Sequence, residues 1–418
     1  MVDIIAVRTD GFGQRLKVML QAMKLASENR IGMKFLWDEK KGAYGSFHSC
    51  GDVNEIFSSD FVERHYIKQK PATVPWRRGI NYSAVGLDIA LRKFDGDAGE
   101  CFREQFESIG FAPRMQNAID LARRPDVARA SAIHLRGGDI LYGELRKHAF
   151  THQDKVIPLP VAKKMIASSD GKRWVVFAQD LALEDELRSY SNVVISSDLR
   201  ADLTSNAEKT VFDIVLMSRC EQIYGGTSAV CDMASIISGK IPIRLSDIFS
   251  SGDVLSAISE DSKYRAGEYD NLLMASLKTS LYYYSARDPS DRALLEEGAV
   301  LDPGNPGFPV LYFFALCSDG RFSEAEELAK DALKRKKASA WLGVIMAFMS
   351  RPAIRQKVFT EDPGNLSMLG YHNAHAIVTF SRACSSGQPA LVGTLEQSVS
   401  PSLDALVAQM QVLLGGRK

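Results

Sequence analysis

The sequence predicts an α/β protein with two facing Rossmann-like domains, each built on a parallel sheet, followed by an all-α domain that resembles helical repeats. Two observations predict this class. Short apolar runs alternate with amphipathic helical stretches as far as Leu245, whereas no strand-like run remains after Ser246. We therefore expect domains at residues 1–128, 129–250 and 251–418, a division that a chain of 418 residues can support at ~150 residues per domain.

The composition is that of a globular protein. Hydrophobic residues make up 45% and charged residues 24% of the chain, which is too apolar for a disordered protein. Lys and Arg together number 51, as do Asp and Glu, so the formal net charge is zero and we expect no nucleic-acid partner. The sequence contains neither a run of 18 apolar residues nor a recognisable secretion signal, so we expect no transmembrane segment.

The six cysteines are scattered and form no CxxC pair; they are Cys50, Cys101, Cys220, Cys231, Cys317 and Cys384. This pattern fits neither a disulfide framework nor a zinc site, and it is typical of a reducing compartment. We therefore expect a cytoplasmic protein without a metal, and leave a peripheral position at the inner membrane open.

The expected elements of the first two domains follow in order. The first domain contains a strand at 2–7, a helix at 16–25, a strand at 33–37 and helices at 101–109 and 113–124. The second contains strands at 131–135, 174–178, 193–195, 223–226 and 241–245, and helices at 161–167, 181–189, 211–220 and 229–238. Strands and helices that alternate at this spacing predict parallel sheets covered by helices on both faces.

The remainder of the chain is expected to be helical. Its helices are expected at 271–284, 292–299, 309–317, 323–334, 338–349 and 403–414. The tetrapeptide DPGN occurs at Asp302–Asn305 and again at Asp362–Asn365, and the stretch that follows the first copy resembles a tetratricopeptide unit. We therefore expect a small helical-repeat-like domain, through which the protein could bind a protein partner or self-associate.

Two glycine-containing segments join predicted strands to predicted helices. Gly11 and Gly13, in GFGQRL, would let the backbone approach a ligand closely at a helix start that offers unpaired N–H groups. Thr227 and Ser228, in GGTS, would add hydroxyl donors suited to a phosphate at the start of the 229–238 helix. A plain strand–helix turn and simple helix capping, respectively, are the alternatives.

Charged residues follow the predicted strand 131–135. HLRGGD places His134, Arg136 and Asp139 at the carboxyl end of a parallel strand, where α/β proteins bind their ligands. The Arg136 guanidinium is a fork of donors that matches phosphate oxygens. A core histidine and a surface ion pair are the alternatives.

Asp213 lies within an apolar helical stretch, TVFDIVLMSRC, so its carboxylate should be buried and hydrogen-bonded. An acidic residue favoured in the first turn of the helix is the alternative explanation.

Together these segments resemble a known family. HLRGGD, FAQD and DIVLMSRCEQIYGGTSAVCDMASII look like three successive motifs of the GDP-fucose-dependent fucosyltransferase superfamily, which includes α1,6-, α1,2- and protein O-fucosyltransferases. GFGQRL is similar to an early glycine turn of the same enzymes, and the resemblance covers Asp3 to Leu245. It implies a GT-B fold with an acceptor-side domain followed by a donor-binding domain, GDP-fucose as donor, inversion at the anomeric carbon, and no metal or other cofactor.

The resemblance also implies roles for single residues. Arg136 would bind the donor β-phosphate and stabilise the leaving GDP, and Thr227 and Ser228 would cradle the same diphosphate. Asp213 and Asp180 would accept hydrogen bonds from the guanine ring or the ribose, and His134 would hold the nucleotide or orient Arg136. The other expected donor-site residues are Gly11, Gly13 and Asp139.

Glu144 resembles the general base for the acceptor hydroxyl, since α1,6-fucosyltransferases carry a glutamate five residues beyond the aspartate of this motif, as here beyond Asp139. A solvated acid at a helix start is the alternative. The sequence thus predicts an inverting, metal-independent transferase that moves fucose from GDP-fucose to a glycan or a lipid-linked oligosaccharide. Transfer from another nucleotide-sugar and a non-catalytic sugar-nucleotide-binding scaffold remain open.

Overall fold

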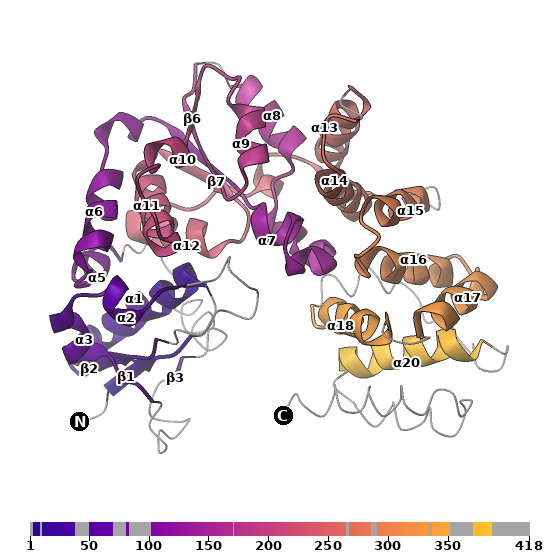
Figure 1. Ribbon diagram of the computed structural model, residues 1–418, viewed down its shortest axis with the longest axis horizontal. Helices are drawn as coiled ribbons and strands as arrows, with labels where there is room; N and C mark the ends of the chain where they lie inside the picture. The colour runs from indigo at the N-terminus through magenta and orange to yellow at the C-terminus, as the bar shows by residue number, and fades with distance from the viewer. Residues whose placement is uncertain are drawn as a thin grey trace. The chain divides into compact units, whose positions relative to one another are not determined.

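The computed structural model describes residues 3–8, 11–37, 50–69, 81–82, 102–169, 171–264, 267–285, 291–333, 337–351 and 371–386 (Figure 1). The expected helix at 403–414 and the second DPGN copy lie outside these residues. The chain divides into two compact units, which we name the α/β unit, Met1–Asp139 with Lys155–Ser250, and the helical unit, Ile140–Asp154 with Ser251–Lys418.

The α/β unit begins with a parallel sheet of three strands in the order β2-β1-β3. Its strands are β1 (Asp3–Ala6), β2 (Gly32–Phe35) and β3 (Asn81–Tyr82). Its helices are α1 (Phe12–Asn29), α2 (Val53–Ile56), α3 (Ser59–His65), α5 (Arg103–Glu107) and α6 (Pro113–Ala122), with a 3₁₀ turn, η2, at Pro125–Val127. Helix α1 starts at Phe12 rather than at the expected Leu16, because Gly11 already accepts the first backbone hydrogen bonds, from Gln14 and Arg15.

A second parallel sheet has the strand order β6-β5-β4-β7. Its strands are β4 (Ser131–Leu135), β5 (Trp174–Ala178), β6 (Val193–Ile195) and β7 (Gln222–Gly225). The helices around it are α8 (Leu159–Ala167), α9 (Leu181–Leu187), α10 (Ser196–Leu199), α11 (Asn206–Arg219) and α12 (Ala229–Ser238). Strand β4 is central, with His134 opposite Phe177 on one side and Gly225 on the other.

The prediction of a closing strand at 241–245 was wrong. Only Ile243 forms a single parallel bridge, to Tyr224, and a 3₁₀ turn, η4, follows at Leu245–Asp247. Pro242 has no N–H to donate to a ladder, which accounts for the absence of a longer strand there.

One apolar core unites both sheets of the α/β unit. Leu16 and Leu20 on α1 are fully buried in the same cluster as Phe212 on α11 and Cys231 on α12, and α1 contacts both of those helices directly. The predicted apolar face of α1 therefore packs between two helices of the second sheet rather than against its own sheet alone.

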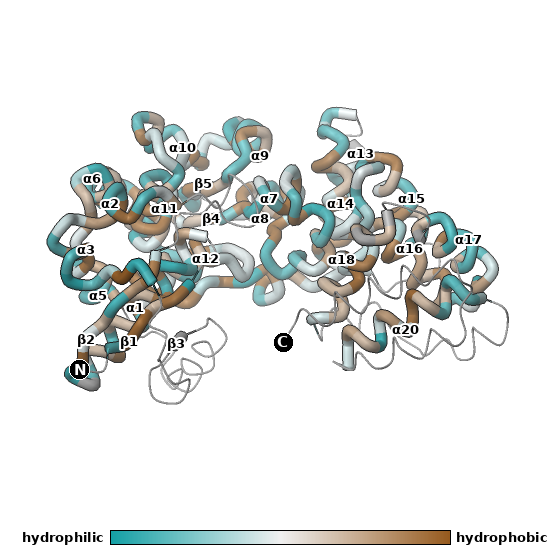
Figure 2. The backbone as a smooth tube through the Cα atoms, turned by 60° about the horizontal axis from the view of Figure 1, so that its bottom comes forward, coloured by the Kyte–Doolittle hydropathy of each residue, from teal (hydrophilic) through white to brown (hydrophobic). Residues whose placement is uncertain are grey.

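The helical unit contains no strand among its described residues. It consists of α13 (Ser251–Tyr264), α14 (Asn271–Tyr284), α15 (Arg292–Leu301), α16 (Gly307–Ser318), α17 (Phe322–Leu333), α18 (Lys337–Met349) and α20 (His372–Ser386), with the 3₁₀ segment η3 (Glu144–Lys155) contributed from the middle of the chain. Figure 2 shows α16 mostly in the apolar colour beside a hydrophilic α17, as expected from a core helix and an amphipathic helix. The helical character is confirmed, and the repeat assignment stays a prediction.

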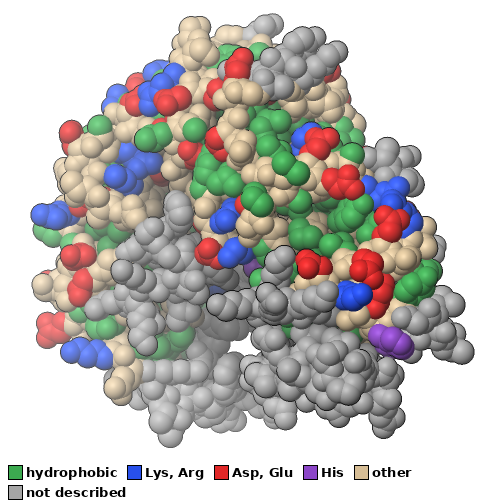
Figure 3. Space-filling view, turned by 45° about the vertical axis from the view of Figure 1, so that its right-hand side comes forward, with side chains coloured by type: hydrophobic (Ala, Val, Ile, Leu, Met, Phe, Trp, Pro, Cys, Tyr) green, Lys and Arg blue, Asp and Glu red, His purple; other side chains and the backbone are tan. Residues whose placement is uncertain are grey.

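The α/β class with parallel sheets is likewise confirmed, while the GT-B arrangement and the three domain boundaries stay predictions. Figure 3 shows cationic and anionic side chains interspersed over one face, in keeping with a formal net charge of zero. Among the described helices, none is long and apolar enough to cross a membrane.

Candidate functional site

The residues predicted to bind a diphosphate follow two neighbouring parallel strands. Arg136 comes directly after β4, and Gly226, Thr227 and Ser228 come directly after β7 (Figure 1). Because β4 and β7 are paired in parallel register, their carboxyl ends lie at one edge of the sheet. This is the edge at which open α/β sheets bind ligands.

Of the two hydroxyl side chains in the turn before α12, one is buried and the other is exposed. Ser228 is buried; its Oγ accepts a hydrogen bond from the N–H of Cys231 and lies 3.4 Å from Nδ1 of His134. Thr227 is exposed. Ser228 therefore caps the helix, as the alternative interpretation expected, and Thr227 is the exposed hydroxyl of the turn.

The glycine turn of α1 approaches the same helix start. A Cβ built on Gly13 would lie 3.2 Å from the carbonyl oxygen of Ala229, the first residue of α12. The side chain of Asp232 in the first turn of α12 is 3.4 Å from Nζ of Lys17 and 3.2 Å from Nη2 of Arg244. The two helix starts are thus packed together and held by an ionic bridge.

Position 226 requires a glycine because the backbone of Lys155 packs directly against it. A Cβ on this residue would lie 2.3 Å from the carbonyl carbon and oxygen of Lys155. Arg244 also donates to the carbonyl oxygens of Gly225, at 3.2 Å, and Gly226. The turn after β7 is therefore fixed from two sides.

Arg136 forms a two-point ion pair with Asp139. Its Nε is 3.1 Å from Oδ1 and its Nη2 is 2.8 Å from Oδ2, with side-chain exposures of 16% for Arg136 and 1% for Asp139. The pair is too buried to be the surface ion pair of the alternative reading, and it fixes the direction of the guanidinium. Among the described residues, Nη1 of Arg136 has no hydrogen-bond partner.

His134 is a neutral, buried histidine. Burial, aided by the nearby Arg136 charge, lowers its pKa to about 3. Its Nδ1 contacts the hydroxyl of Ser228, the cap of α12. This contact can orient the Ser228 side chain at the start of that helix.

Of the two residues predicted from the sequence to bind the nucleobase, Asp213 lines a cavity and Asp180 does not. Asp180, after β5, caps α9 by accepting a hydrogen bond of 2.9 Å from the N–H of Ala182. A cavity of 430 Å³ is lined by Ala178 and Gln179 from the end of β5 and by Asp213 from α11; its other lining residues are Leu181, Glu184, Ser197, Arg200, Ala201, Asn206, Lys209 and Thr210. The geometry does not bring Asp180 into this lining.

Asp213 is held within this cavity wall by polar partners. Its Oδ1 is 2.8 Å from the hydroxyl of Ser196, which donates to it, and 3.0 Å from Nε of Arg200. Burial raises its pKa to about 6, against the opposing effect of Arg200. The first-turn explanation was wrong, because α11 begins at Asn206, two helical turns earlier.

Glu144 belongs to the helical unit and is exposed. Its Oε2 accepts a hydrogen bond of 2.6 Å from Nζ of Lys147, and this contact lowers the pKa of the carboxyl. The side chain is ionised near neutral pH and open to a ligand, as a base must be.

The sequence analysis missed Arg200 and Arg244, which hold Asp213 and the β7 turn. Each lies distant in sequence from the groups it contacts, so a local pattern could not indicate it. The described residues contain no cluster of three His, Cys, Asp or Glu side chains that could hold a metal ion.

Comparison with known proteins finds remote structural similarity. No family model and no curated protein matches the chain. A structure of the NodZ α-1,6-fucosyltransferase soaked with GDP-fucose shares 17% identity over 59% of this chain and 96% of that one, with a TM-score of 0.35. A structure of fucosyltransferase NodZ from Bradyrhizobium shares 16% identity over 56% and 93%, with a TM-score of 0.33. TM-scores this low carry no functional argument.

Proposed function

We propose that the α/β unit binds the diphosphate of a GDP-sugar and that the protein is an inverting glycosyltransferase, with GDP-fucose as donor. One observation carries this proposal: a partly buried guanidinium, Arg136, follows β4 at the same sheet edge where the exposed Thr227 precedes the cap of α12. Unpaired N–H groups at a helix start and an arginine fork both favour a diphosphate. The sequence motifs that resemble the fucosyltransferases contain the same residues.

Asp139 prepares Arg136 for this role. The bonds to Asp139 use Nε and Nη2, which leaves Nη1 to donate to a phosphate oxygen. As the bond between the anomeric carbon and the β-phosphate breaks, negative charge grows on the leaving GDP. A cation held in place beforehand stabilises that charge more in the transition state than in the ground state.

The cavity beside β5 is the proposed nucleobase site. An ionised Asp213 can accept from the two adjacent N–H donors of guanine, and no adenine edge offers such a pair. An acceptor hydroxyl, which loses its proton to Glu144, would attack the anomeric carbon from the face opposite GDP. The acceptor we propose is a glycan or a lipid-linked oligosaccharide, and the mechanism requires no metal.

Titration calorimetry with GDP, UDP and dTDP tests the donor class. We expect GDP to bind most tightly, and weaker binding of GDP than of the other two would overturn the guanine assignment. Release of GDP from GDP-fucose by the purified protein tests catalysis, since a non-catalytic scaffold would bind GDP without turnover. A glycan array with the active donor would then identify the acceptor.

Arg136→Ala tests the single observation that carries the proposal. We expect GDP release to be lost while the circular dichroism spectrum is retained. Arg173→Ala is the matched control, because Arg173 precedes β5 at the amino end of the same sheet and pairs with Asp126.

A further inference from the structure

A second group of charged residues surrounds a cavity of 270 Å³ in the α/β unit. The cavity is lined by residues of α5 and α11 and by residues at the ends of α6 and α12. Because α11 ends just before β7 begins, its last turn lies at the amino edge of the second sheet. Arg136 and Thr227 follow strands and lie at the carboxyl edge. The cavity is therefore separate from the proposed donor site.

Four cationic side chains line this cavity, and we name them the basic cluster: Arg103, Arg123, Arg219 and Lys240. Glu107 is the carboxylate in the lining, and within the described part of the chain it forms no ion pair. The formal net charge of the whole protein is zero. The positive charge around this cavity is therefore a local concentration and not a general property of the surface.

Two guanidinium groups of the basic cluster keep donors available for a ligand. Arg103 is exposed and has neither a hydrogen bond nor an ion pair with any described residue. Arg219 is also exposed and donates from Nε to the carbonyl oxygen of Arg124 at 3.4 Å. The two terminal nitrogens of Arg219 have no hydrogen-bond partner in the described ranges. These are the nitrogens with which an arginine grips two oxygens of one anion.

Lys240 is held in place by the end of α11. Its Nζ donates to the carbonyl oxygens of Ser218, at 2.9 Å, and Cys220, which uses two of its three N–H donors. Burial lowers the pKa of Lys240 below its ordinary value, and the neighbouring charges of Arg103 and Arg219 add to this effect. The members of the basic cluster therefore repel one another, and a bound anion would relieve that repulsion.

The ends of helices explain only part of this arrangement. A helix C-terminus attracts cations, and Arg123, Arg219 and Lys240 each lie at or just beyond one. Such an end carries only about half a unit of negative charge, so it does not neutralise a whole cation. Arg103 stands at the start of α5, where the helix offers a cation no such attraction. The cluster thus keeps an excess of positive charge.

We propose that Arg103, Arg219 and Lys240 form a second anion site, which binds a phosphate or diphosphate group of a ligand other than the sugar donor. The two guanidinium forks match phosphate oxygens, and the lysine adds a fixed point charge. A volume of 270 Å³ is at the lower end for small-molecule sites, so it suits such a group rather than a whole nucleotide-sugar. The inference does not depend on the proposed function, because the cluster shares no residue with the proposed donor site.

Inorganic pyrophosphate is the probe, titrated into the full chain in a calorimeter. Arg103→Gln and Arg219→Gln should each raise its Kd roughly 10-fold, because each removes hydrogen bonds between charged groups. Both residues are exposed, so both variants should fold. Because pyrophosphate can also bind near Arg136, the titrations are repeated in Arg136→Ala. The binding event assigned to the basic cluster should remain there and should show the same two losses.

Glu107→Gln covers the case in which the arginine variants do not fold. Loss of the carboxylate from the lining should tighten pyrophosphate binding roughly two- to fivefold, a gain that misfolding cannot produce. Arg114→Gln is the matched control. Arg114 is exposed and has no ion pair with a described residue, but it lies in the first turn of α6, at the opposite end of that helix from Arg123. We expect its Kd to equal that of the wild type.

Sedimentation with lipid vesicles distinguishes the two sources of such a phosphate group. Binding to vesicles of phosphatidylglycerol and phosphatidylcholine in equal parts, but not to phosphatidylcholine alone, would assign a lipid headgroup if both arginine variants lose it. Binding of pyrophosphate without vesicle binding would assign a soluble ligand.

Three results would overturn the inference. The first is a wild type that binds neither pyrophosphate nor the anionic vesicles. The second is wild-type affinity in both Arg103→Gln and Arg219→Gln, and the third is an equal loss of affinity in Arg114→Gln. Failure of the wild type to bind GDP would instead count against the proposed function alone.

Discussion

Strands β4 and β7 end at the same edge of one sheet, but the chain continues from them in different ways. After β7, only Gly226, Thr227 and Ser228 precede α12; the Lys155 backbone packs against Gly226 at one end of this turn, and the Ser228 hydroxyl caps α12 at the other. After β4, the chain passes through the helical unit before it reaches α8. The short turn offers N–H and hydroxyl groups, the donors that the proposed function assigns to a diphosphate. The longer connection carries Glu144, an exposed carboxylate that the proposed function assigns as the base.

The comparison makes the two segments separable by experiment. Changes near the β7 turn and Arg136 should affect donor binding and all turnover. Changes at Glu144 and its partner Lys147 should affect proton removal alone. The largest effect is expected at Arg136, the first residue after β4.

Arg136→Ala should lower the kcat for GDP-fucose hydrolysis roughly 100- to 1000-fold, the loss typical of removing a preorganised donor from a developing anion. It should also lower the free energy of unfolding by about 3 kcal/mol, because Asp139 stays buried without its arginine. Rate assays and urea titrations measure the two effects.

The double variant Arg136→Ala with Asp139→Asn separates them. Removing the buried charge should restore much of the stability, but not the rate. Recovery of hydrolysis in this double variant would mean that the guanidinium holds the fold and not the leaving group.

Gly226→Ala should destabilise the protein by about 3 kcal/mol, because the new methyl group meets the Lys155 backbone rather than a movable side chain. Thermal and urea unfolding measure this loss. Gly343→Ala in α18 is the control: a Cβ there meets nothing within 4 Å, so the variant should be more stable by about 0.5–1 kcal/mol. A tolerated Gly226→Ala would show that the turn after β7 is looser than the geometry indicates.

Much of the second sheet could be predicted from the sequence. The bounds of β4, β5, β6 and α12 agree with the expectation, because the three strands are short and mostly apolar and α12 is a mostly apolar stretch between Ser228 and Gly239. Helices α2 and α3 were not predicted, since four- and seven-residue helices are too short to show a period. Helices α13 and α20 were also missed.

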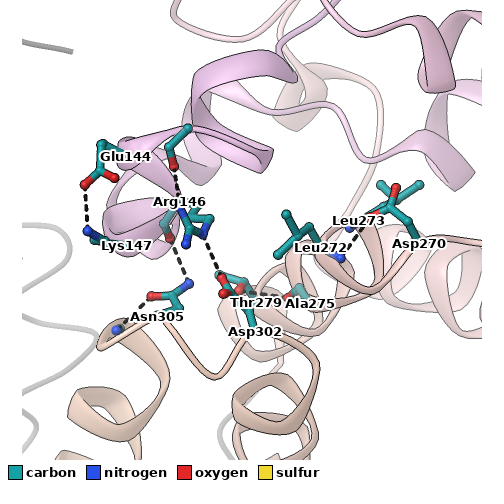
Figure 4. A network of polar contacts seen from close by, with 12 residues as sticks. Glu144, Arg146, Lys147, Asp270, Leu272, Leu273, Ala275, Thr279, Asp302 and Asn305 are labelled. Carbon is teal, nitrogen blue, oxygen red and sulfur yellow. Dashed lines mark hydrogen bonds and ion pairs between the residues drawn. The ribbon is translucent and has the colours of Figure 1, made fainter. Parts of the chain in front are cut away.

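The candidate site was less predictable than the fold. The sequence indicated Arg136 and Asp139, but not that they would pair in a buried position, because burial depends on the packing around them. The contact between Arg146 and Asp302 joins residues 156 positions apart, which no local pattern can indicate. The sequence indicated the first DPGN copy only as part of a repeat-like stretch, whereas its Asp302 and Asn305 both contact Arg146 (Figure 4).

The pH dependence of GDP binding tests the nucleobase site. In the native protein the pKa of Asp213 is about 6, above the ordinary value near 3.8, so the native state binds more protons between these values. The free energy of unfolding should therefore decrease as the pH rises from 4 to 6, by about 3 kcal/mol in total, and Asp213→Asn should remove this slope. Guanine needs the ionised form, so affinity should increase over the same range.

Calorimetry at pH 5 and pH 7.5 should show GDP binding about 10-fold weaker at the lower pH. The β-phosphate of GDP also titrates in this window, so the informative quantity is the difference between the wild type and Asp213→Asn. Glu184→Gln is the second control, since burial raises the pKa of Glu184 in the same cavity. Identical pH dependence in the wild type and Asp213→Asn would place the nucleobase elsewhere.

The smallest effect should come from Lys147→Met, next to the predicted base. Lys147 lowers the pKa of Glu144 through a hydrogen bond and its charge, so its removal should raise that pKa toward the ordinary value of 4.5. The acidic limb of the kcat/KM profile should then move to higher pH, because a carboxyl with a higher pKa stays protonated, and inactive as a base, up to a higher pH. At neutral pH the stronger base should change kcat by about two- to fivefold at most. An unmoved limb would show that a group other than Glu144 removes the proton.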